Sequence, residues 1–201
     1  ASNTTAVHAP TPSFTSVPAT PACGGVNSTY TTQTGEASYA WSVPGTAGTD
    51  YTIVSGGIGS TDNTVTLSWI TTGSKTVTVN YTDGFGCTGT SAASNTSSVN
   101  PSPAAITGAS SVCTGSTITL SNTTSGGTWT SSTPAMANVG STTGVVTGFS
   151  PGAPSIIYTL PSGCTASHLV NVYQTPTGIS GTFQACEGGA QTLTNGYSGG
   201  V

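Results

Sequence analysis

One short phrase occurs three times in the sequence, and this repetition constrains the fold more than any other feature does. The phrase is Cys-x-Gly, and its copies begin at Cys23, Cys113 and Cys186. Each copy follows a proline-containing joint and opens a threonine-rich stretch. Residues 103–127 and 176–200 align without a gap and share their Pro, Ile, Leu and Asn positions as well as the phrase itself. Repetition of this kind predicts a tandem array of small structural units.

The repeats and their joints divide the chain into four segments. We expect residues 1–9 to be the last strand and joint of a preceding repeat, and residues 10–100 to be a first complete domain. Residues 101–174 are expected to be a second domain, and residues 175–201 the truncated start of a third. The third copy stops at Val201, one residue before the tryptophan of the second copy, which predicts a piece of a longer chain. Proline-rich joints are semi-rigid spacers, so they predict an extended array.

Apolar and polar residues alternate along several short stretches of both predicted domains. This alternation is typical of half-buried β-strands, and threonine, a β-branched residue, suits the outward positions. Clusters of Gly, Ser, Asn and Pro between the stretches predict turns. No sustained helical stripe is present, so we predict an all-β sandwich fold. The predicted strands include residues 39–43, 65–69, 77–81, 118–120, 156–158 and 170–172.

Three tryptophans are predicted core residues. Trp41 lies 18 residues after Cys23, and Trp129 lies 16 residues after Cys113. A tryptophan packed on an inter-sheet disulfide is typical of immunoglobulin-type cores. Trp69 lies in an alternating stretch and is also assigned to the core. The alternative for these rings is an exposed platform on which sugars stack. With the core assignment, the predicted fold class is tandem Ig-like β-sandwich domains.

The five cysteines predict disulfides. A second shared phrase, Gly-Cys-Thr, places Cys87 and Cys164 downstream in their repeats. We therefore predict disulfides Cys23–Cys87 and Cys113–Cys164, with Cys186 paired to a cysteine beyond Val201. Disulfides imply an oxidising, extracellular location. The alternative is a zinc site, but zinc ligands cluster at spacings such as Cys-x-x-Cys, which this sequence lacks, and the only histidines, His8 and His168, are isolated.

Charged residues make up only 3% of the chain, and this excludes several functions. A single basic residue, Lys75, cannot neutralise a nucleic-acid backbone. No apolar run is long enough for a membrane-spanning helix, and no basic amphipathic helix is present. The carboxylates are scattered and lie mostly beside turn residues, so we assign them to turn capping and solvation and predict no enzyme. They are Glu36, Asp50, Asp62, Asp83 and Glu187.

No cofactor is predicted. Calcium is the weaker alternative, because Asp50, Asp62 and Asp83 lack the closely spaced oxygen ligands that calcium needs. Glycosylation is a further hypothesis, because a charge-poor surface would gain solvation from sugars. The Asn-x-Ser/Thr sequons are at Asn3, Asn27, Asn80, Asn95 and Asn122.

Residues 113–172 resemble the group 2 bacterial Ig-like domain family. The matching residues are 128–132, 137–139, 143–148, 151–152 and 156–158. The first domain resembles PKD-like domains through residues 39–41, 65–69, 73–79 and 86–87. Arrays of such modules resemble very large surface adhesins of Bacteroidota-type bacteria, including gliding-motility adhesins. That resemblance implies export by a type IX secretion system, cell-surface adhesion, and no catalytic residues.

Three functional hypotheses remain open from the sequence. The leading one is a structural and adhesive segment of a long secreted protein that forms a cell-surface stalk or filament. Its expected partners are neighbouring repeats, further copies in a filament, and surface or glycan ligands, with no nucleic acid and no membrane insertion. The second is a polymerising, pilus-like filament subunit, in which exposed sheet edges pair between chains. The third is a spacer module of a secreted hydrolase.

Overall fold

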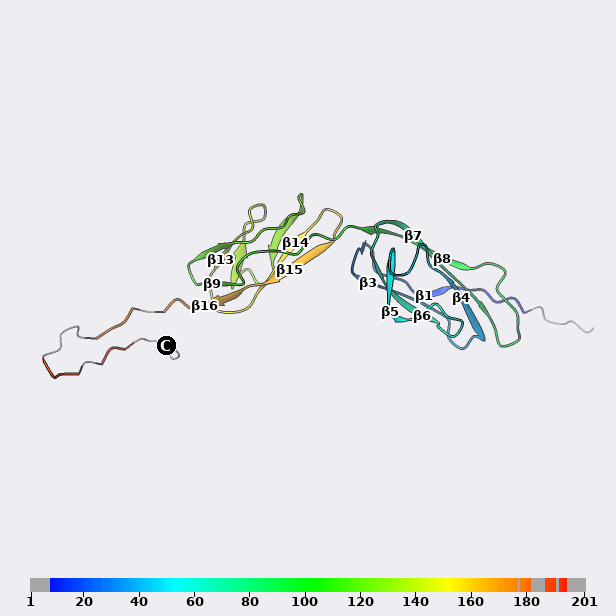
Figure 1. Cartoon of the computed structure of the whole chain (residues 1–201), viewed down its shortest axis with the longest axis horizontal. Helices are drawn as coiled ribbons and strands as arrows, with labels where there is room; N and C mark the ends of the chain where they lie inside the picture. The colour runs from blue at the N-terminus through cyan, green and yellow to red at the C-terminus, as the bar shows by residue number, and fades with distance from the viewer. Residues whose placement is uncertain (1–7, 177, 182–186, 191, 195–201) are drawn as a thin grey trace, which may run out of the picture. The chain divides into compact units, whose positions relative to one another are not determined.

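The computed structural model describes residues 8–176, 178–181, 187–190 and 192–194, and these residues form strands, turns and loops without a helix (Figure 1). The chain divides into two compact units. Unit 1 comprises residues 1–103 together with 160–165, and unit 2 comprises residues 104–159 together with 166–201. The predicted all-β class is confirmed. Of the predicted first segment, residues 1–7 lie outside the described part of the chain.

Unit 1 contains two four-stranded sheets. The first has the order β1-β3-β6-β5, and the second has the order β2-β8-β7-β4. Neighbouring strands are antiparallel except for β2 and β8, which run parallel. The bounds are β1 Phe14–Ser16, β2 Ala22–Cys23, β3 Asn27–Thr32, β4 Ser38–Ser42, β5 Tyr51–Gly56, β6 Thr64–Trp69, β7 Gly73–Thr82 and β8 Ala93–Asn100.

The core of unit 1 lies between these two sheets. Leu67 and Trp69 of β6 are fully buried with Val77 of the opposite sheet, as alternation along each strand requires. Trp41 packs against this core but stays partly exposed, and its Nε1 donates a hydrogen bond to the Asp62 carbonyl over 2.6 Å. One core therefore draws residues from both sheets, which defines a β-sandwich.

The only basic side chain of the sequence is folded onto the core of unit 1. Lys75 lies on β7 with 9% of its surface exposed. Its Nζ is 5.4 Å from the Trp69 ring centroid, a cation–π distance, and donates a hydrogen bond to the Thr71 hydroxyl over 2.7 Å. Thr71 in turn donates to Asp50 Oδ1 over 3.1 Å.

Unit 2 has three smaller sheets with the orders β10-β13-β12, β11-β14-β15 and β16-β9. The pair β16–β9 is parallel and the other pairings whose register is defined are antiparallel. The core contains Leu120, Trp129, Val146, Ile156 and Val172, all buried. The bounds are β9 Ser111–Cys113, β10 Thr117–Thr119, β11 Thr128–Ser131, β12 Ala137–Val139, β13 Val145–Gly148, β14 Ser155–Thr159, β15 Thr165–Leu169 and β16 Asn171–Tyr173.

The disulfide of the structure differs from both predicted pairs. Cys23 is bonded to Cys164, with their Cα atoms 5.8 Å apart, and both residues belong to unit 1. Cys87 and Cys113 carry free thiols. The predicted pairs Cys23–Cys87 and Cys113–Cys164 are therefore wrong, and Cys186 lies outside the described residues. The prediction of an immunoglobulin-type arrangement, in which a tryptophan packs on a disulfide within one repeat, is therefore also wrong.

Strand length explains why Cys23 and Cys87 do not meet. Cys23 pairs with Asn100, and the adjacent Val99 pairs with Gly73 at the start of β7. Cys87 follows the other end of β7, which is ten residues long. At about 3.3 Å per residue, the two cysteines are separated by roughly 30 Å, whereas disulfide-bonded Cα atoms lie within about 7 Å.

Strand order also explains why Cys113 does not meet Cys164. Cys113 ends β9, where it pairs with Tyr173 at the end of β16. Cys164 precedes β15, so both β15 and β16 lie between it and Tyr173 along the chain. The shared phrases identified the equivalent cysteines of the two repeats, but the positions of the strand ends determine which of them lie together.

Candidate functional site

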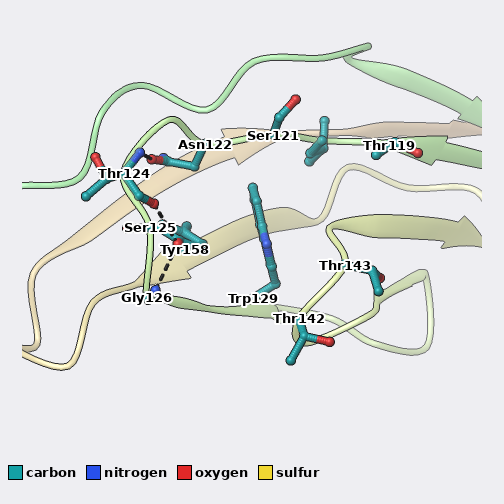
Figure 2. Close-up of a pocket in the computed structure, with 12 residues that line it drawn as sticks. Thr119, Ser121, Asn122, Thr124, Ser125, Gly126, Trp129, Thr142, Thr143 and Tyr158 are labelled. Atoms are coloured by element: carbon teal, nitrogen blue, oxygen red, sulfur yellow. Dashed lines mark hydrogen bonds between the residues drawn. The ribbon is translucent and has the colours of Figure 1, made fainter.

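The candidate site is a pocket in unit 2 beside Trp129 (Figure 2). Its volume is about 340 Å³. The walls come from the loop between β10 and β11, from the turn before β13, and from β11 and β14. The lining residues are Thr119, Leu120, Ser121, Asn122, Thr124, Ser125, Gly126, Gly127, Trp129, Thr142, Thr143 and Tyr158.

Hydrogen bonds between side chains and backbone groups hold the loop 121–127 in place. Asn122 Oδ1 accepts the Thr124 N–H over 2.9 Å, a short-range turn that asparagine favours. Asn122 Nδ2 donates to the Ala104 carbonyl over 2.6 Å. Ala104 N–H donates to the Thr124 hydroxyl over 2.9 Å. These bonds give the pocket a preformed wall before any ligand arrives.

An aromatic pair forms the base of the pocket. Trp129 and Tyr158 are register partners on β11 and β14, and their ring centroids are 4.7 Å apart. The Tyr158 hydroxyl donates to the Thr124 carbonyl over 2.7 Å and accepts the Gly127 N–H over 2.8 Å (Figure 2). Tyr158 therefore ties the base to the loop wall.

Close backbone approach fixes the turn on the other side of the Trp129 ring. Gly144 has φ +70, and a Cβ there would lie 2.3 Å from the Leu120 carbonyl oxygen and 3.2 Å from the Trp129 ring. The Leu120 N–H also donates to the Gly144 carbonyl over 2.9 Å. Only glycine combines this φ with this space, and it places Thr142 and Thr143 at the pocket edge.

The chemistry of the pocket is neutral. Six of the lining residues carry hydroxyl side chains: Thr119, Ser121, Thr124, Ser125, Thr142 and Thr143. The lining residues include no carboxylate, no basic side chain, no histidine and no cysteine. Hydroxyls both donate and accept, and an aromatic edge offers an apolar surface, so the arrangement suits a neutral ligand with many hydroxyl groups.

The sequence identified Trp129 but not this pocket. Trp129 is 6% exposed, so its ring belongs to the core and presents only a small edge to the pocket. The alternative that sugars stack on the tryptophan rings is therefore limited, at Trp129, to the exposed edge of the ring. Thr142 and Thr143 carried no sequence signal of a binding site, because Ser and Thr are common throughout the chain. Trp69 is fully buried in unit 1.

The scattered carboxylates organise turns in unit 1. The Thr46 N–H, the Thr71 hydroxyl and the Lys75 charge lower the pKa of Asp50, against a smaller opposing effect of burial. Asp62 Oδ2 accepts the Gly59 N–H over 2.9 Å. Asp50 and Asp62 both accept a hydrogen bond from a nearby turn N–H, and Asp50 also links its turn to Thr71.

Asp83 is the most enclosed of these carboxylates. Burial raises its pKa, but hydrogen bonds from the Cys87 and Phe85 N–H groups and the neighbouring His8 outweigh burial, so the net pKa is lowered. His8 Nδ1 pairs with Asp83 Oδ2. Elsewhere, His168 Nε2 shares a hydrogen bond with Ser110 Oγ over 3.2 Å. Within the described ranges, no three His, Cys, Asp or Glu residues are grouped to hold a metal ion.

Two of the predicted glycosylation sites already use their side-chain nitrogen. Asn80 Nδ2 donates to the Gly89 carbonyl over 2.9 Å, and Asn122 Nδ2 is bonded as described above. Asn27 is exposed and Asn95 is half-buried. Asn3 lies outside the described residues. The geometry therefore favours Asn27 as the most accessible of the four described sequons.

Comparisons with known proteins give only distant likenesses. No protein-family model matches the chain, and no curated protein sequence matches it. A fragment of intimin solved with the intimin-binding domain of its translocated receptor is 17% identical, with 82% of this chain and 66% of that chain covered and a TM-score of 0.36. The Escherichia coli adhesin FdeC is 18% identical, with 81% and 63% covered and a TM-score of 0.31.

A third likeness is to Bacteroides ovatus SGBP-B, solved with a mixed-linkage heptasaccharide. It is 14% identical, with 81% of this chain and 45% of that chain covered and a TM-score of 0.28. The chain thus spans less than two thirds of each of these three structures. These TM-scores are too low for the likenesses to indicate a function of this chain. A search of the described residues for a long apolar helix that could cross a membrane found none.

Proposed function

We propose that this chain is a structural and adhesive segment of a long secreted repeat protein that forms a stalk or filament at a bacterial cell surface. The Cys23–Cys164 disulfide is the observation that carries the proposal, because it joins cysteines of two consecutive sequence repeats. A covalent bond of this kind limits how far the chain extends when the strands are pulled apart. It also supports an oxidising, extracellular working environment, where disulfides persist.

The resemblance of the sequence to PKD-like and group 2 bacterial Ig-like modules supports this role. Proteins built from such arrays include Bacteroidota-type gliding adhesins exported by type IX secretion, and we extend that origin to this chain as part of the proposal. The domain boundaries at residues 10–100 and 101–174 belong to the same proposal. The low charge of the sequence supports contacts made through hydroxyls and backbone rather than through ions.

We assign the adhesive contact to the pocket beside Trp129. Its six hydroxyls and its aromatic edge fit a neutral glycan, in which sugar hydroxyls meet Ser and Thr and a sugar C–H face meets the ring. The hydrogen-bonded loop 121–127 is preformed, so binding requires little ordering of the protein.

Electron microscopy of the native particle tests the stalk. The length of its polypeptide is read in parallel on a denaturing, reducing gel. A beaded filament made of one very long chain is the expected result. A filament that dissociates into short chains would instead favour a polymerising subunit, and a compact particle without a fibre would favour a spacer module of a hydrolase.

A glycan array of neutral and charged oligosaccharides tests the pocket. We expect binding to neutral glycans, weakened about tenfold in the double variant Ser125→Ala/Thr142→Ala, because two hydrogen bonds worth about 1 kcal/mol each are removed in part. Thr117→Ala is the matched control, since it removes an exposed hydroxyl of unit 2 outside this pocket. Equal binding by the double variant and the control would remove the pocket from the adhesive role.

A further inference from the structure

The turns that carry Cys87 and Cys164 have the same backbone geometry. In the turn 83–87, the Asp83 N–H donates to the Cys87 carbonyl over 3.0 Å and the Gly86 N–H donates to the Asp83 carbonyl over 3.0 Å. In the turn 160–164, the Leu160 N–H donates to the Cys164 carbonyl over 2.9 Å and the Gly163 N–H donates to the Leu160 carbonyl over 2.8 Å.

The glycine before each cysteine is also equivalent. Gly86 has φ 81 and Gly163 has φ 86, so both turns use the left-handed conformation at the same place. Cys87 is therefore presented in the way that Cys164 is presented, although only Cys164 is in a disulfide.

The two Cys-x-Gly phrases are equivalent as well. Cys23 ends β2 beside Asn100 of the parallel strand β8, and the next N–H, that of Gly24, donates to the Asn100 carbonyl over 2.9 Å. Cys113 ends β9 beside Tyr173 of the parallel strand β16, and the next N–H, that of Thr114, donates to the Tyr173 carbonyl over 2.8 Å.

Each phrase then closes in the same turn. The Val26 N–H donates to the Cys23 carbonyl over 3.1 Å, and the Ser116 N–H donates to the Cys113 carbonyl over 3.0 Å. The intervening glycines, Gly25 and Gly115, have φ 75 and 80. Each of these two repeats thus offers one cysteine in a Cys-x-Gly turn and one in a Gly-Cys turn, and the Cys23–Cys164 disulfide joins the first kind in repeat 10–100 to the second kind in repeat 101–174.

We propose that Cys87 and Cys113 are disulfide sites whose partners are cysteines of further copies of the repeat. Cys113 bonds to the Gly-Cys turn of a copy that follows, and Cys87 bonds to the Cys-x-Gly turn of a copy that precedes. The protein is then joined by one disulfide per consecutive pair of repeats. This inference rests on the proposed long repeat protein, and it is independent of glycan binding at the pocket.

The chemistry of each bond is an ordinary thiol oxidation. Two thiols lose two protons and two electrons and form one S–S bond, and a disulfide-form thiol–disulfide oxidoreductase accepts the electrons and becomes a dithiol. Such enzymes attack exposed thiols through a mixed disulfide. Cys113 is exposed and Cys87 is half-buried, so both thiols are open to this exchange.

The first experiment extends the chain after Gln174 with a second copy of residues 101–174, in place of residues 175–201. Ser162→Ala in the added copy marks its Gly-Cys peptide by mass, and Cys113→Ser in the added copy leaves the original Cys113 as the only thiol in its peptide. After refolding with an oxidoreductase and alkylation of free thiols, peptic peptides are mapped by mass spectrometry. We expect Cys113 bonded to the added copy's counterpart of Cys164, the Cys23–Cys164 bond retained, and loss of Cys113 alkylation relative to the original chain.

Cys113→Ser in the original copy as well is the matched variant. It should free the added copy's thiol for alkylation and leave Cys23–Cys164 intact. A bond between Cys113 and Cys164, or an alkylated Cys113 in an extended chain that retains Cys23–Cys164, overturns the proposal.

A mirrored chain gives an independent measurement if the first extension fails to form Cys23–Cys164. A second copy of residues 10–100, with Cys87→Ser in that copy, is placed before residue 10, and Cys87 of the original copy is expected to bond to the added copy's counterpart of Cys23. Cys87 that remains alkylated in this chain would overturn the proposal by itself.

Discussion

At the scale of single residues, the three aspartates of this protein stabilise backbone turns. Asp83 is 5% exposed and accepts hydrogen bonds from the N–H groups of Phe85 and Cys87, each over 2.9 Å. These bonds form only with an oxygen acceptor held in the folded turn, and they favour the ionised carboxylate. The turn that presents the Cys87 thiol therefore depends on one buried negative charge.

This carboxylate predicts a loss of stability in acid. The folded-state pKa of Asp83 lies below its ordinary value of 3.8, so its contribution is complete above that value and is lost as the pH falls through the lower, folded-state pKa. Asp83→Asn should flatten the dependence of the unfolding free energy on pH below about pH 4, measured by urea unfolding. Glu187→Gln, which also removes one carboxylate but at an exposed position, is the matched control.

Gly144 supplies a second prediction at this scale. Gly144→Ala adds a Cβ 2.3 Å from the Leu120 carbonyl oxygen, besides forcing an L-residue to φ +70. Gly126→Ala is the matched control, because Gly126 has φ +87 but nothing within 4 Å of a Cβ. We expect about 1–2 kcal/mol of strain from φ alone in the control and a larger loss at Gly144, measured by thermal unfolding. Equal losses of stability in the two variants would show that the turn around Gly144 relaxes to accommodate the added Cβ.

Single residues also show where sequence reasoning succeeded and failed. Composition predicted that the carboxylates would cap turns, because isolated Asp beside Gly has few other uses, and Asp62 and Asp83 both do so. The cysteine pairs could not be predicted, because bonding depends on which strand ends lie together in three dimensions. The two phrases are local signals, and neither carries that information.

At the scale of elements, alternation along the chain predicted the central strands well. The stretches 65–69 and 77–81 fall within β6 and β7, whose inward residues form the core of unit 1. The edge strand β5 was missed, since only Tyr51 is buried and its register shifts between Ile53 and Ser55. The parallel pairs β2–β8 and β9–β16 were also missed, because alternation is the same for either strand direction.

Two valines test the burial of these strands. Val77→Ala on β7 removes methyl groups from a fully buried site and should lower the unfolding free energy by about 2–3 kcal/mol. Val54→Ala on β5 makes the same chemical change at a site that is 50% exposed and should cost less than about 1 kcal/mol. Urea unfolding measures both, and similar losses would mean that the sandwich core is not centred where the structure places it.

At the scale of the whole molecule, one bond closes most of the chain into a loop. Cys23 and Cys164 are separated by 141 residues in sequence, and in the chain-entropy model such a loop stabilises by about 5 kcal/mol, with measured values commonly about 2–5 kcal/mol. The repeat pattern of the sequence predicted a disulfide within each repeat. It did not predict that a staple would run from one sequence repeat to the next.

Reduction of this bond gives the corresponding prediction. Dithiothreitol should lower the unfolding free energy by about 2–5 kcal/mol, and Cys164→Ser should show the same lower value whether or not the reductant is present. Cys87→Ser is the control and should respond to the reductant as the original chain does, because its thiol is free. An unfolding free energy of the original chain that is the same with and without dithiothreitol would contradict the Cys23–Cys164 bond.

The buried lysine has a consequence for digestion by proteases. Trypsin cleaves after Lys and Arg, and Lys75, the only such residue, is 9% exposed on a strand paired through Ser97 to β8. We expect the native protein to resist trypsin until unit 1 unfolds, whereas Thr49→Lys, in an exposed loop, should be cut in the native state. A surface protein of this composition would withstand tryptic enzymes around it, and a single cut, when it came, would record the unfolding of one domain.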